Sequence, residues 1–386
     1  MTAIHITVAE VVFWTAALLM AYAYLGYPLL LAVIAACRPR RAPEPGYCPR
    51  LTVLIAAYNE AANIVRKLKE TLALTYPPEL LEILVVSDGS TDGTDDLVKS
   101  VDDPRVRLLR IEGRNGKTNA QNEGVKQCRG EVIVFSDATA TYHPKALAYL
   151  ACNYQDQTVG AVSGRYQYFD RDGDSPTGLG SMAFWNYENV IKSLQSRIKT
   201  LTGCSGCIYS VRKSVYTPLP PSACSDLVEP LCIVRSGHRV VFESRALAYE
   251  ETTRSSEEEF GMRVRVATRG MRGVLTVRQL LNVFRYPWIA FQLICHKILR
   301  WLVPVWLLLI FCATFFLSGV PVYRDLLFLQ IGFYGFALLS LLVPLHRKWN
   351  VLGIPLFFIT LNAAALVGLL ETVRGHRYVV WETVRK

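Results

Sequence analysis

Residues that could bind a nucleotide follow four short apolar runs of the sequence. The polar clusters mix carboxylates and hydroxyls with a basic, Gly-rich stretch: Tyr58-Asn59-Glu60, Ser87-Asp88-Gly89-Ser90, Gly113-Arg114-Asn115-Gly116-Lys117 and Ser136-Asp137-Ala138-Thr139. One such cluster would be an ordinary helix cap, because Ser, Asp and Asn are preferred at helix N-termini. Four such clusters, each directly after an apolar run, indicate a pocket in which acids contact the base and ribose of a nucleotide while cations and backbone N–H groups contact its phosphates.

Two familiar phosphate-binding motifs are absent from these clusters. The NTPase phosphate loop needs Gly five residues before Gly116, and Ile111 stands there. The dinucleotide fingerprint of three glycines does not follow the first apolar run, 51–57. The sequence therefore disfavours an NTPase of this type and a hydride-transferring enzyme.

Strands and helices alternate in the part of the chain that carries the clusters. The apolar runs predict strands, and the periodic stretches between them predict helices; the strands are 51–57, 81–86, 106–111 and 131–135, and the helices 60–73, 92–101 and 118–128. This order is typical of a parallel, doubly wound α/β sheet, a Rossmann-like fold. Ligands of such sheets bind at the carboxyl ends of the strands, where all four clusters fall.

The composition indicates a membrane protein. The 386 residues include 42 Lys and Arg against 32 Asp and Glu, a net charge of +10, yet only 19% are charged and 51% are hydrophobic. Soluble domains average about 25% charged residues. Stretches 11–36, 301–320, 326–345 and 351–370 contain no charged residue and predict transmembrane helices, the last one either crossing or re-entrant. Such charge-free spans argue against a transporter, and no nucleic-acid-binding module accompanies the basic excess.

Basic residues predict the orientation of these spans. Arg38, Arg40 and Arg41 follow the first span and His346, Arg347 and Lys348 follow the third, so both places should be cytoplasmic. The sequence Ile34-Ala35-Ala36-Cys37 resembles a lipoprotein cleavage box, but residues 1–10 lack Lys and Arg, so an uncleaved anchor is favoured. The basic tail 371–386 would end outside by simple counting. Either the fourth span enters the membrane and returns without crossing it, or the preference of basic residues for the cytoplasmic side, the charge rule, does not hold for this tail.

Three further segments complete the organisation. Residues 37–50 form a basic, Pro-rich linker, 51–275 an α/β domain, and 278–300 an interfacial amphipathic helix. The stretch 181–199 has a similar composition, and for Trp185 packing against the sheet is an equal alternative to lipid contact. The ten cysteines indicate no disulfide framework, and the pair Cys204 and Cys207 lacks the second pair that a zinc site needs.

The chain resembles the family 2 inverting glycosyltransferases with a GT-A fold, over about residues 50–270. The resemblance lies in LTVLIAAYNE, VVSDGSTDGT, GRNGKTNAQNEG and VIVFSDAT, followed by a Gly-rich loop and an acidic helix start at Ser225-Asp226. With its flanking spans, the chain is most similar to membrane-embedded members such as the cellulose, hyaluronan and chitin-oligosaccharide synthases.

The resemblance implies a donor site. It places Ala57, Tyr58 and Glu60 at the base and ribose, Asp88 at the base, Lys117 near the donor, and Asp137 as the first acid of an Asp-x-Asp motif that holds Mg²⁺ or Mn²⁺. The second acid of that motif is Thr139 here. A hydroxyl is a poor replacement for a carboxylate ligand to a hard divalent cation.

The resemblance also implies a base and a leaving-group site. Asp226 matches the catalytic base, with Ser225 in place of the partner acid; the alternative is that either residue merely caps a helix at 227–236. Arg263 and Arg265 would contact the departing diphosphate, although Met262 and Val266 replace the Gln and Trp of the family pattern. For the basic residues Arg269 and Arg272, contact with anionic lipid headgroups is an equal possibility.

By resemblance, the protein transfers a sugar from a nucleotide-sugar donor, with UDP favoured, to a saccharide or lipid-linked acceptor at the cytoplasmic face of the membrane. The product would serve cell-surface polysaccharide or glycolipid synthesis. Four spans are few for a secretion channel, so a polymerase would need a homodimer or an export partner, and single transfer competes with polymer synthesis. Thr139 and Val266 motivate the alternative of a catalytically inactive, nucleotide-sugar-sensing membrane protein.

Overall fold

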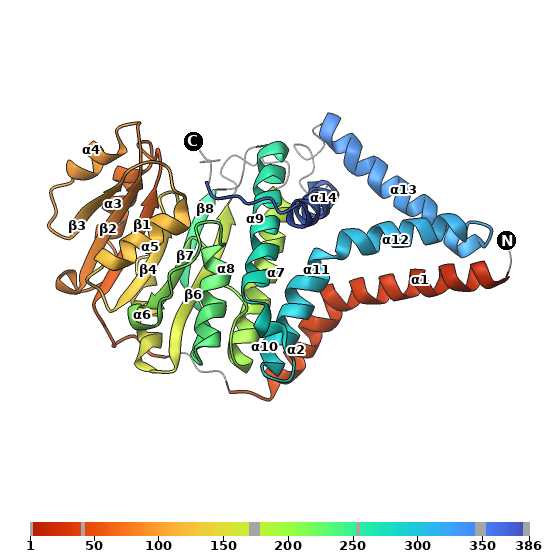
Figure 1. Cartoon of the computed structure of the whole chain (residues 1–386), viewed down its shortest axis with the longest axis horizontal. Helices are drawn as coiled ribbons and strands as arrows, with labels where there is room; N and C mark the ends of the chain where they lie inside the picture. Colours follow the sequence, from red (N-terminus) through yellow and green to blue (C-terminus); the bar gives the residue numbers. More distant parts are fainter. Residues whose placement is uncertain (1–2, 40–42, 170–177, 252–254, 344–352, 381–386) are drawn as a thin grey trace.

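The computed structural model describes residues 3–39, 43–169, 178–251, 255–343 and 353–380 (Figure 1). A sheet with its helices forms one half of the molecule, and long helices from both ends of the chain extend from the other half. The residues His346, Arg347 and Lys348, together with Arg40, Arg41, Arg385 and Lys386, lie outside the described residues.

The first half of the domain has the predicted parallel order. Strands β1 (Leu51–Ala57), β2 (Leu81–Asp88), β3 (Val106–Ile111) and β4 (Val132–Asp137) pair in parallel as β3-β2-β1-β4. The connecting helices are α3 (Ile64–Leu72), α4 (Thr94–Lys99) and α5 (Lys117–Gln127). Every residue of β1 and β2 is buried, which explains why both read as continuous apolar runs.

The second half of the sheet is mixed rather than wholly parallel, as a GT-A-like fold is. Strand β7 (Ile208–Arg212) runs antiparallel to both β4 and β6 (Val159–Phe169), β8 (Arg239–Glu251) pairs parallel with β6, and the short β5 (Thr141–Tyr142) closes the edge. Helices α6 (Ala146–Cys152), α7 (Gly178–Ile198), α8 (Ser225–Arg235) and α9 (Ser256–Thr276) belong to this half. Short 3₁₀ turns lie at Pro78–Leu80, Asn153–Gln155 and Lys213–Val215.

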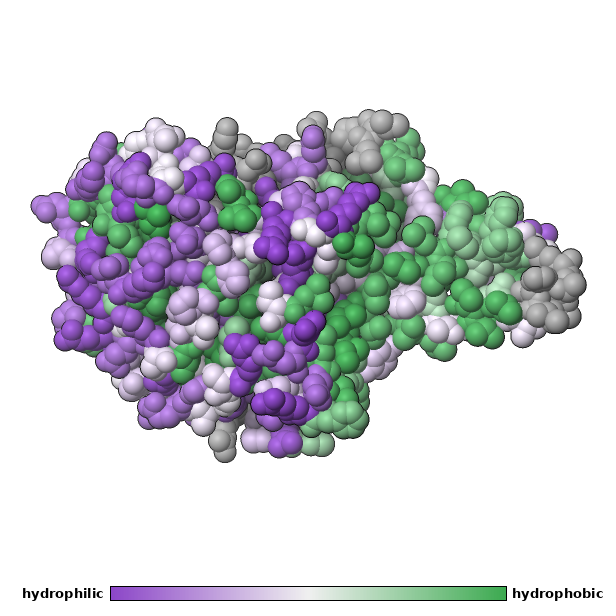
Figure 2. All heavy atoms as spheres, in the orientation of Figure 1, coloured by the Kyte–Doolittle hydropathy of each residue, from purple (hydrophilic) through white to green (hydrophobic). Residues whose placement is uncertain are grey.

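The helices outside the sheet carry an apolar surface. Helix α1 (Ala3–Ala21) continues through a π-helical turn η1 (Tyr22–Gly26) into α2 (Tyr27–Ala36). Among the described residues, Thr7–Ala36, Pro321–Ser340 and Gly353–Val373 are each long and apolar enough to cross a membrane. A helix pair bent by 54°, Pro287–Trp301 and Val303–Phe316, would make a fourth span if it is counted as one. Figure 2 shows the apolar side chains gathered over the end of the molecule that α1, α12 and α13 form.

The predicted interfacial helix 278–300 is divided. It consists of a 3₁₀ turn η5 (Arg278–Leu281), α10 (Pro287–Gln292), a π-helical segment η6 (Leu293–Ile298) and α11 (Leu299–Trp301). Helix α12 (Val303–Phe316) follows at an angle, with Pro304 in its first turn, where a missing N–H costs least. The basic residues Lys297 and Arg300 face an interior cavity instead of a flat lipid surface.

The last apolar stretch packs against the catalytic domain. Helix α13 (Pro321–Leu342) leads to α14 (Gly353–Val373), which lies against α7 and α9; Figure 1 shows α14 end-on beside α9, while α1 and α12 run across the view. After α14 the chain returns to the domain, and the Val379 carbonyl lies close to Gly116. The described part of the tail therefore lies beside the catalytic domain, as it would if the fourth stretch did not cross the membrane.

Glycines permit the close approach of α14, which gives a first prediction. A Cβ at Gly368 would lie 2.8 Å from Ala267 Cβ and 3.2 Å from the Thr268 nitrogen, both on α9. We expect Gly368→Leu to lower the free energy of unfolding by about 1–3 kcal/mol, because a side chain at that contact forces the helices apart. Thermal unfolding in detergent measures this. The control is Gly332→Leu on α13, where an added Cβ meets no atom within 4 Å; equal melting temperatures for the two variants would contradict this packing.

Candidate active site

A cavity of about 330 Å³ lies at the carboxyl edge of the sheet. Strand β1 contributes Ala56 to its wall and β4 contributes Asp137; the loop before β7 contributes Gly206, and helices α8 and α9 close it. Six of the predicted site residues line this one space: Glu60, Lys117, Asp137, Asp226, Arg263 and Arg265. Glu60, Lys117 and Asp137 come together because the carboxyl ends of parallel strands meet at the same edge, whereas Asp226, Arg263 and Arg265 reach the cavity from α8 and α9.

Lys117 and Asp137 form an ion pair inside the cavity. Lys117 begins α5 directly after Gly116, whose φ of 96° is a conformation that favours glycine. Burial alone would lower the pKa of Lys117, but the charge of Asp137 and the hydrogen bond to it raise this pKa above its ordinary value. The ammonium therefore stays charged, at a place where an anionic phosphate group could replace or share its carboxylate partner.

Three predicted donor residues do not line the cavity. Ala57 and Asp88 are fully buried at the strand ends, and the Tyr58 ring is covered by the guanidinium of Arg114 at 4.2 Å. The Asp88 carboxylate accepts the backbone N–H groups of Asn115 (3.0 Å) and Gly116 (2.8 Å), so it holds the Gly-rich loop in shape. Contact of these three residues with a donor stays a prediction.

Glu250 lies beside the position where the second acid of the motif is missing. The Thr139 hydroxyl donates to Glu250 Oε1 at 2.6 Å, and the Tyr166 hydroxyl donates to the other carboxylate oxygen. Glu250 stands near the end of β8 and lines the same cavity as Asp137. Glu250 is not among the residues predicted from the sequence; its only local signal is an acidic pair, Glu250-Glu251, that ends a short apolar run.

The Asp226 carboxylate does not cap helix α8. The N-cap residue is Cys224, and no side chain forms a cap hydrogen bond there. The Cys224 thiol instead donates to Asp226 Oδ1 at 2.9 Å, and burial raises the pKa of this thiol, so it keeps its proton. A Cβ on Gly206 would lie 2.8 Å from Asp226 Oδ2. The capping alternative is therefore wrong, and the carboxylate faces the cavity.

The arginines of α9 differ in what they contact. Arg263 is buried, donates through Nε to Glu259 Oε1 at 2.7 Å, and has no hydrogen-bond partner for Nη2 among the described residues. Arg269 donates to the carbonyl of Ala223 and, at 3.2 Å, to the hydroxyl of Thr118. Arg272 reaches the carbonyl of Thr372 on α14. Both guanidinium groups thus have partners inside the protein, and contact of Arg269 and Arg272 with lipid headgroups stays a prediction.

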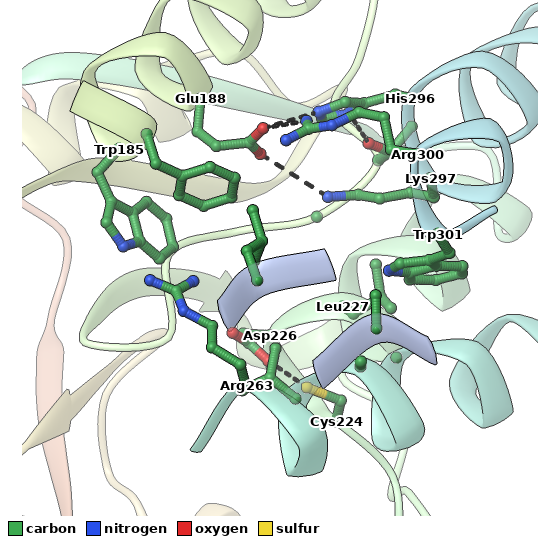
Figure 3. A pocket seen from close by; sticks show the side chains of 18 of the residues that line it. Trp185, Glu188, Cys224, Asp226, Leu227, Arg263, His296, Lys297, Arg300 and Trp301 are labelled. Carbon is green, nitrogen blue, oxygen red and sulfur yellow. Dashed lines mark hydrogen bonds and ion pairs between the residues drawn. The ribbon is translucent and has the colours of Figure 1, made fainter. Parts of the chain in front are cut away.

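A second cavity, of about 200 Å³, shares Asp226, Trp185 and Arg263 with the first (Figure 3). It lies among α7, the segment from η6 to α11, and α14. Trp185 packs edge-on against Tyr166 with ring centroids 4.6 Å apart, so this indole belongs to the wall between the two cavities and not to a lipid-facing surface. Asp226 can therefore be approached from two sides.

The comparisons agree with the resemblance. Residues 52–217 match the family described as "Glycosyl transferase family 2". The chain is 35% identical over 125 residues to the "Probable glycosyltransferase YdaM" of Bacillus subtilis, a match that covers 31% of this chain and 30% of that protein. It is 30% identical over 179 residues to a "Poly-beta-1,6-N-acetyl-D-glucosamine synthase" of Staphylococcus aureus, covering 46% and 41%. The chain thus spans less than half the length of these curated relatives.

A solved structure shows the same fold over almost the whole chain. It is that of the mannosyltransferase PcManGT from Pyrobaculum calidifontis in complex with GDP-Man and Mn²⁺, with a TM-score of 0.69 and 23% sequence identity. The likeness covers 94% of this chain and 99% of that one, so it extends beyond the sheet to the helices at both ends.

Burial of Glu60 predicts a pH dependence of stability. Burial raises the pKa of Glu60 from 4.5 to about 7, and the neighbouring Asp137 contributes to the rise while a hydrogen bond from Asn63 opposes it. The folded protein then holds a proton that the unfolded chain releases, so stability falls as the pH rises from about 4.5 to 7. Glu60→Gln, which cannot ionise, should gain up to about 3 kcal/mol over the unaltered protein across that range.

Melting temperatures of the two proteins at about pH 5 and about pH 8 test this linkage. The matched control is Glu79→Gln, on an exposed 3₁₀ turn. A difference between Glu60→Gln and the unaltered protein that does not grow with pH would contradict the burial of an ionisable group there.

Proposed function

Because the chain carries a glycosyl transferase family 2 domain over residues 52–217, we propose that it transfers a sugar from a nucleotide-sugar donor to an acceptor at a membrane surface. The observation that supports this best is the convergence of Lys117, Asp137 and Asp226 on one cavity at the carboxyl edge of the sheet. A cation beside one carboxylate suits a sugar diphosphate, and a second carboxylate opposite suits an acceptor hydroxyl.

The reaction is an in-line displacement at the anomeric carbon. The acceptor hydroxyl oxygen forms the new bond to this carbon while the bond from the carbon to the diphosphate oxygen breaks, and its electron pair leaves with the nucleoside diphosphate. Asp226 takes the proton of the acceptor hydroxyl. Lys117 and the guanidinium groups of Arg263 and Arg265 stabilise the charge that develops on the leaving diphosphate. Such a displacement inverts the anomeric configuration, so an α-linked donor yields a β-linked product.

The residues fit a divalent cation that is shared with the donor. Asp137 and Glu250 place carboxylates in the donor cavity, with the Thr139 hydroxyl bonded to Glu250. No three His, Cys, Asp or Glu side chains among the described residues are grouped to hold a metal by themselves. Mg²⁺ and Mn²⁺ accept substrate phosphates as ligands, so Asp137, with Glu250 beside it, would hold the ion together with the diphosphate. When bound, such an ion neutralises charge on the leaving group.

The resemblance and the relatives support a proposal for the donor class and the product. The resemblance favours a UDP-sugar, and the Staphylococcus aureus relative is named for a polymer of N-acetyl-D-glucosamine. We therefore propose a hexosyl or N-acetylhexosaminyl transfer in cell-surface polysaccharide or glycolipid synthesis. Val266 lines the donor cavity where the family pattern has an aromatic platform, which favours short products over a long processive chain.

The catalytic domain lies on the cytoplasmic side in this proposal. Arg38 follows the first candidate span, and the described tail with Arg374 and Arg377 returns to the domain, so positive charge gathers on one side. Two crossings after the domain, by α12 and α13, leave α14 on the domain side. This arrangement removes the conflict between the basic tail and the charge rule.

Replacing Asp226 tests the enzyme against the sensor alternative. We expect Asp226→Asn to reduce release of UDP from the UDP-sugar in the presence of acceptor by about 10²–10⁴-fold, because the amide cannot accept the proton. UDP affinity should stay within about twofold, since the base acts on the acceptor side. The control is Asp96→Asn, an exposed acid on α4. Donor binding without turnover by the unaltered protein would support the sensor, and full turnover by Asp226→Asn would place the base elsewhere.

Gly206 tests the position of the base without removing it. Gly206→Ala would place a methyl group 2.8 Å from Asp226 Oδ2, so the carboxylate must rotate away. We expect kcat to fall by about 10–100-fold with little change in the KM for the donor, because a displacement near 1 Å at a reacting group has effects of this order. Gly261→Ala on α9 is the control, because its Cβ would meet no atom within 4 Å. Unchanged kcat in Gly206→Ala would show that the carboxylate does not need its present position.

A further inference from the structure

The second cavity holds buried charges that the transfer reaction does not use. Figure 3 shows Asp226 and Arg263 at one end of it, and Glu188, His296, Lys297 and Arg300 at the other. Glu188 on α7 accepts bonds from Arg300 and, at 3.3 Å, from His296, and Lys297 lies 3.9 Å from its second oxygen. A single carboxylate thus faces two cations of the segment from η6 to α11.

Positive charge is in excess in this cavity. Lys192 on α7 is also buried there and donates to the Ser205 hydroxyl at 2.8 Å, a neutral partner. Arg263 is balanced by Glu259, so the remaining lining cations Lys192, Lys297 and Arg300 stand against the acids Glu188 and Asp226. An uncompensated buried cation is costly, and burial accordingly lowers the pKa of Lys192. A bound anion would restore the balance.

The Lys297 side chain has unused hydrogen-bonding capacity toward such an anion. Among the described residues, the Lys297 ammonium has only the 3.9 Å contact with Glu188, although an ammonium has three N–H donors. Charge-assisted bonds from Lys and Arg to phosphate oxygens are among the strong hydrogen bonds of proteins.

The remaining wall of the cavity is formed by candidate membrane helices. Leu361, Asn362 and Ala365 come from α14, Tyr24 comes from the turn η1 within the first candidate span, and Trp301 ends the first half of the bent pair. A ligand here has an apolar environment on one side, cations in the middle and Asp226 on the other side.

We propose that this cavity binds the phosphate group of a lipid-linked saccharide, with the lipid chain along the apolar helices and the acceptor hydroxyl toward Asp226. The proposal rests on the proposed function and specifies its acceptor class. Lys297 is the main phosphate-binding residue, while Arg300 and Lys192 supply the surrounding positive field.

The binding test uses the full chain in phosphatidylcholine nanodiscs without nucleotide-sugar. Farnesyl phosphate is the probe, farnesol the uncharged analogue, and binding is followed by tryptophan fluorescence, because Trp185 and Trp301 line the cavity. We expect farnesyl phosphate to bind at least about tenfold more tightly than farnesol, the order expected for one charge-assisted hydrogen bond. This comparison needs no variant.

Variants then locate the site. Lys297→Gln should weaken farnesyl phosphate binding by about tenfold or more, and Lys297→Arg should stay within about threefold of the unaltered protein. Lys199→Gln, an exposed lysine at the end of α7, should change nothing. Equal affinity for farnesol and farnesyl phosphate, or an unaltered affinity in a folded Lys297→Gln variant, would overturn the proposal.

Inorganic phosphate distinguishes the two sources of the anion. Competition by inorganic phosphate only at concentrations far above that of farnesyl phosphate supports a lipid-linked ligand. Equally tight binding of inorganic phosphate would overturn the lipid part of the proposal. The binding test contains no donor, so its failure would contradict the phosphate site but not the proposed transfer reaction. Failure of the Asp226→Asn test would contradict the proposed base but not the phosphate site.

Discussion

One carboxylate, that of Asp226, lines both cavities and so connects the two binding sites that we propose. Its place is fixed by the backbone, because the Cys204 N–H donates to the Asp226 carbonyl at 2.7 Å and so ties the start of α8 to the loop before β7. Gly206 leaves room for the carboxylate, and the Cys224 thiol orients it. The result is a single acid between a donor cavity on the sheet side and a cationic cavity on the membrane side.

The two cavities differ in how the charges that line them are balanced. On the donor side, Lys117 and Asp137 neutralise one another at moderate exposure, so an incoming diphosphate exchanges one anionic partner for another. On the membrane side, Glu188 is shared among several cations in a buried place, and Lys192 donates to a neutral partner, the Ser205 hydroxyl. Desolvation makes such an arrangement expensive, so it is better explained by a ligand than by stability.

How much of this arrangement the sequence could predict depends on the separation of the residues involved. The four parallel strands and the cluster of Glu60, Lys117 and Asp137 follow from a local rule, because side chains that follow parallel strands meet at one edge. Asp226 required the family resemblance, since a helix start with Ser and Asp looks like a cap. Glu250, which bonds Thr139 across 111 positions, and Glu188, which meets Arg300 across 112, obey no local pattern. The pairing of Lys297 and Arg300 with Glu188 inside the cavity is likewise not predicted by composition, whereas the interfacial position of 278–300 stays a prediction.

The last helix and the residues after it form part of the wall of both cavities. The sheet domain and the membrane part therefore depend on each other. Residues of α14 line the membrane-side cavity, and Tyr378 and Val380, beyond its end, line the donor cavity. Gly180 on α7 and Gly368 on α14 allow α14 to pack closely against α7 and α9, because small residues let apolar helices approach one another. A domain ending at residue 275 would therefore keep the sheet, Lys117 and Asp137 but lose Lys297, Arg300 and one wall of each cavity. In the reaction that we propose, the donor chemistry belongs to the sheet, whereas the acceptor site needs the sheet domain and the apolar helices packed together.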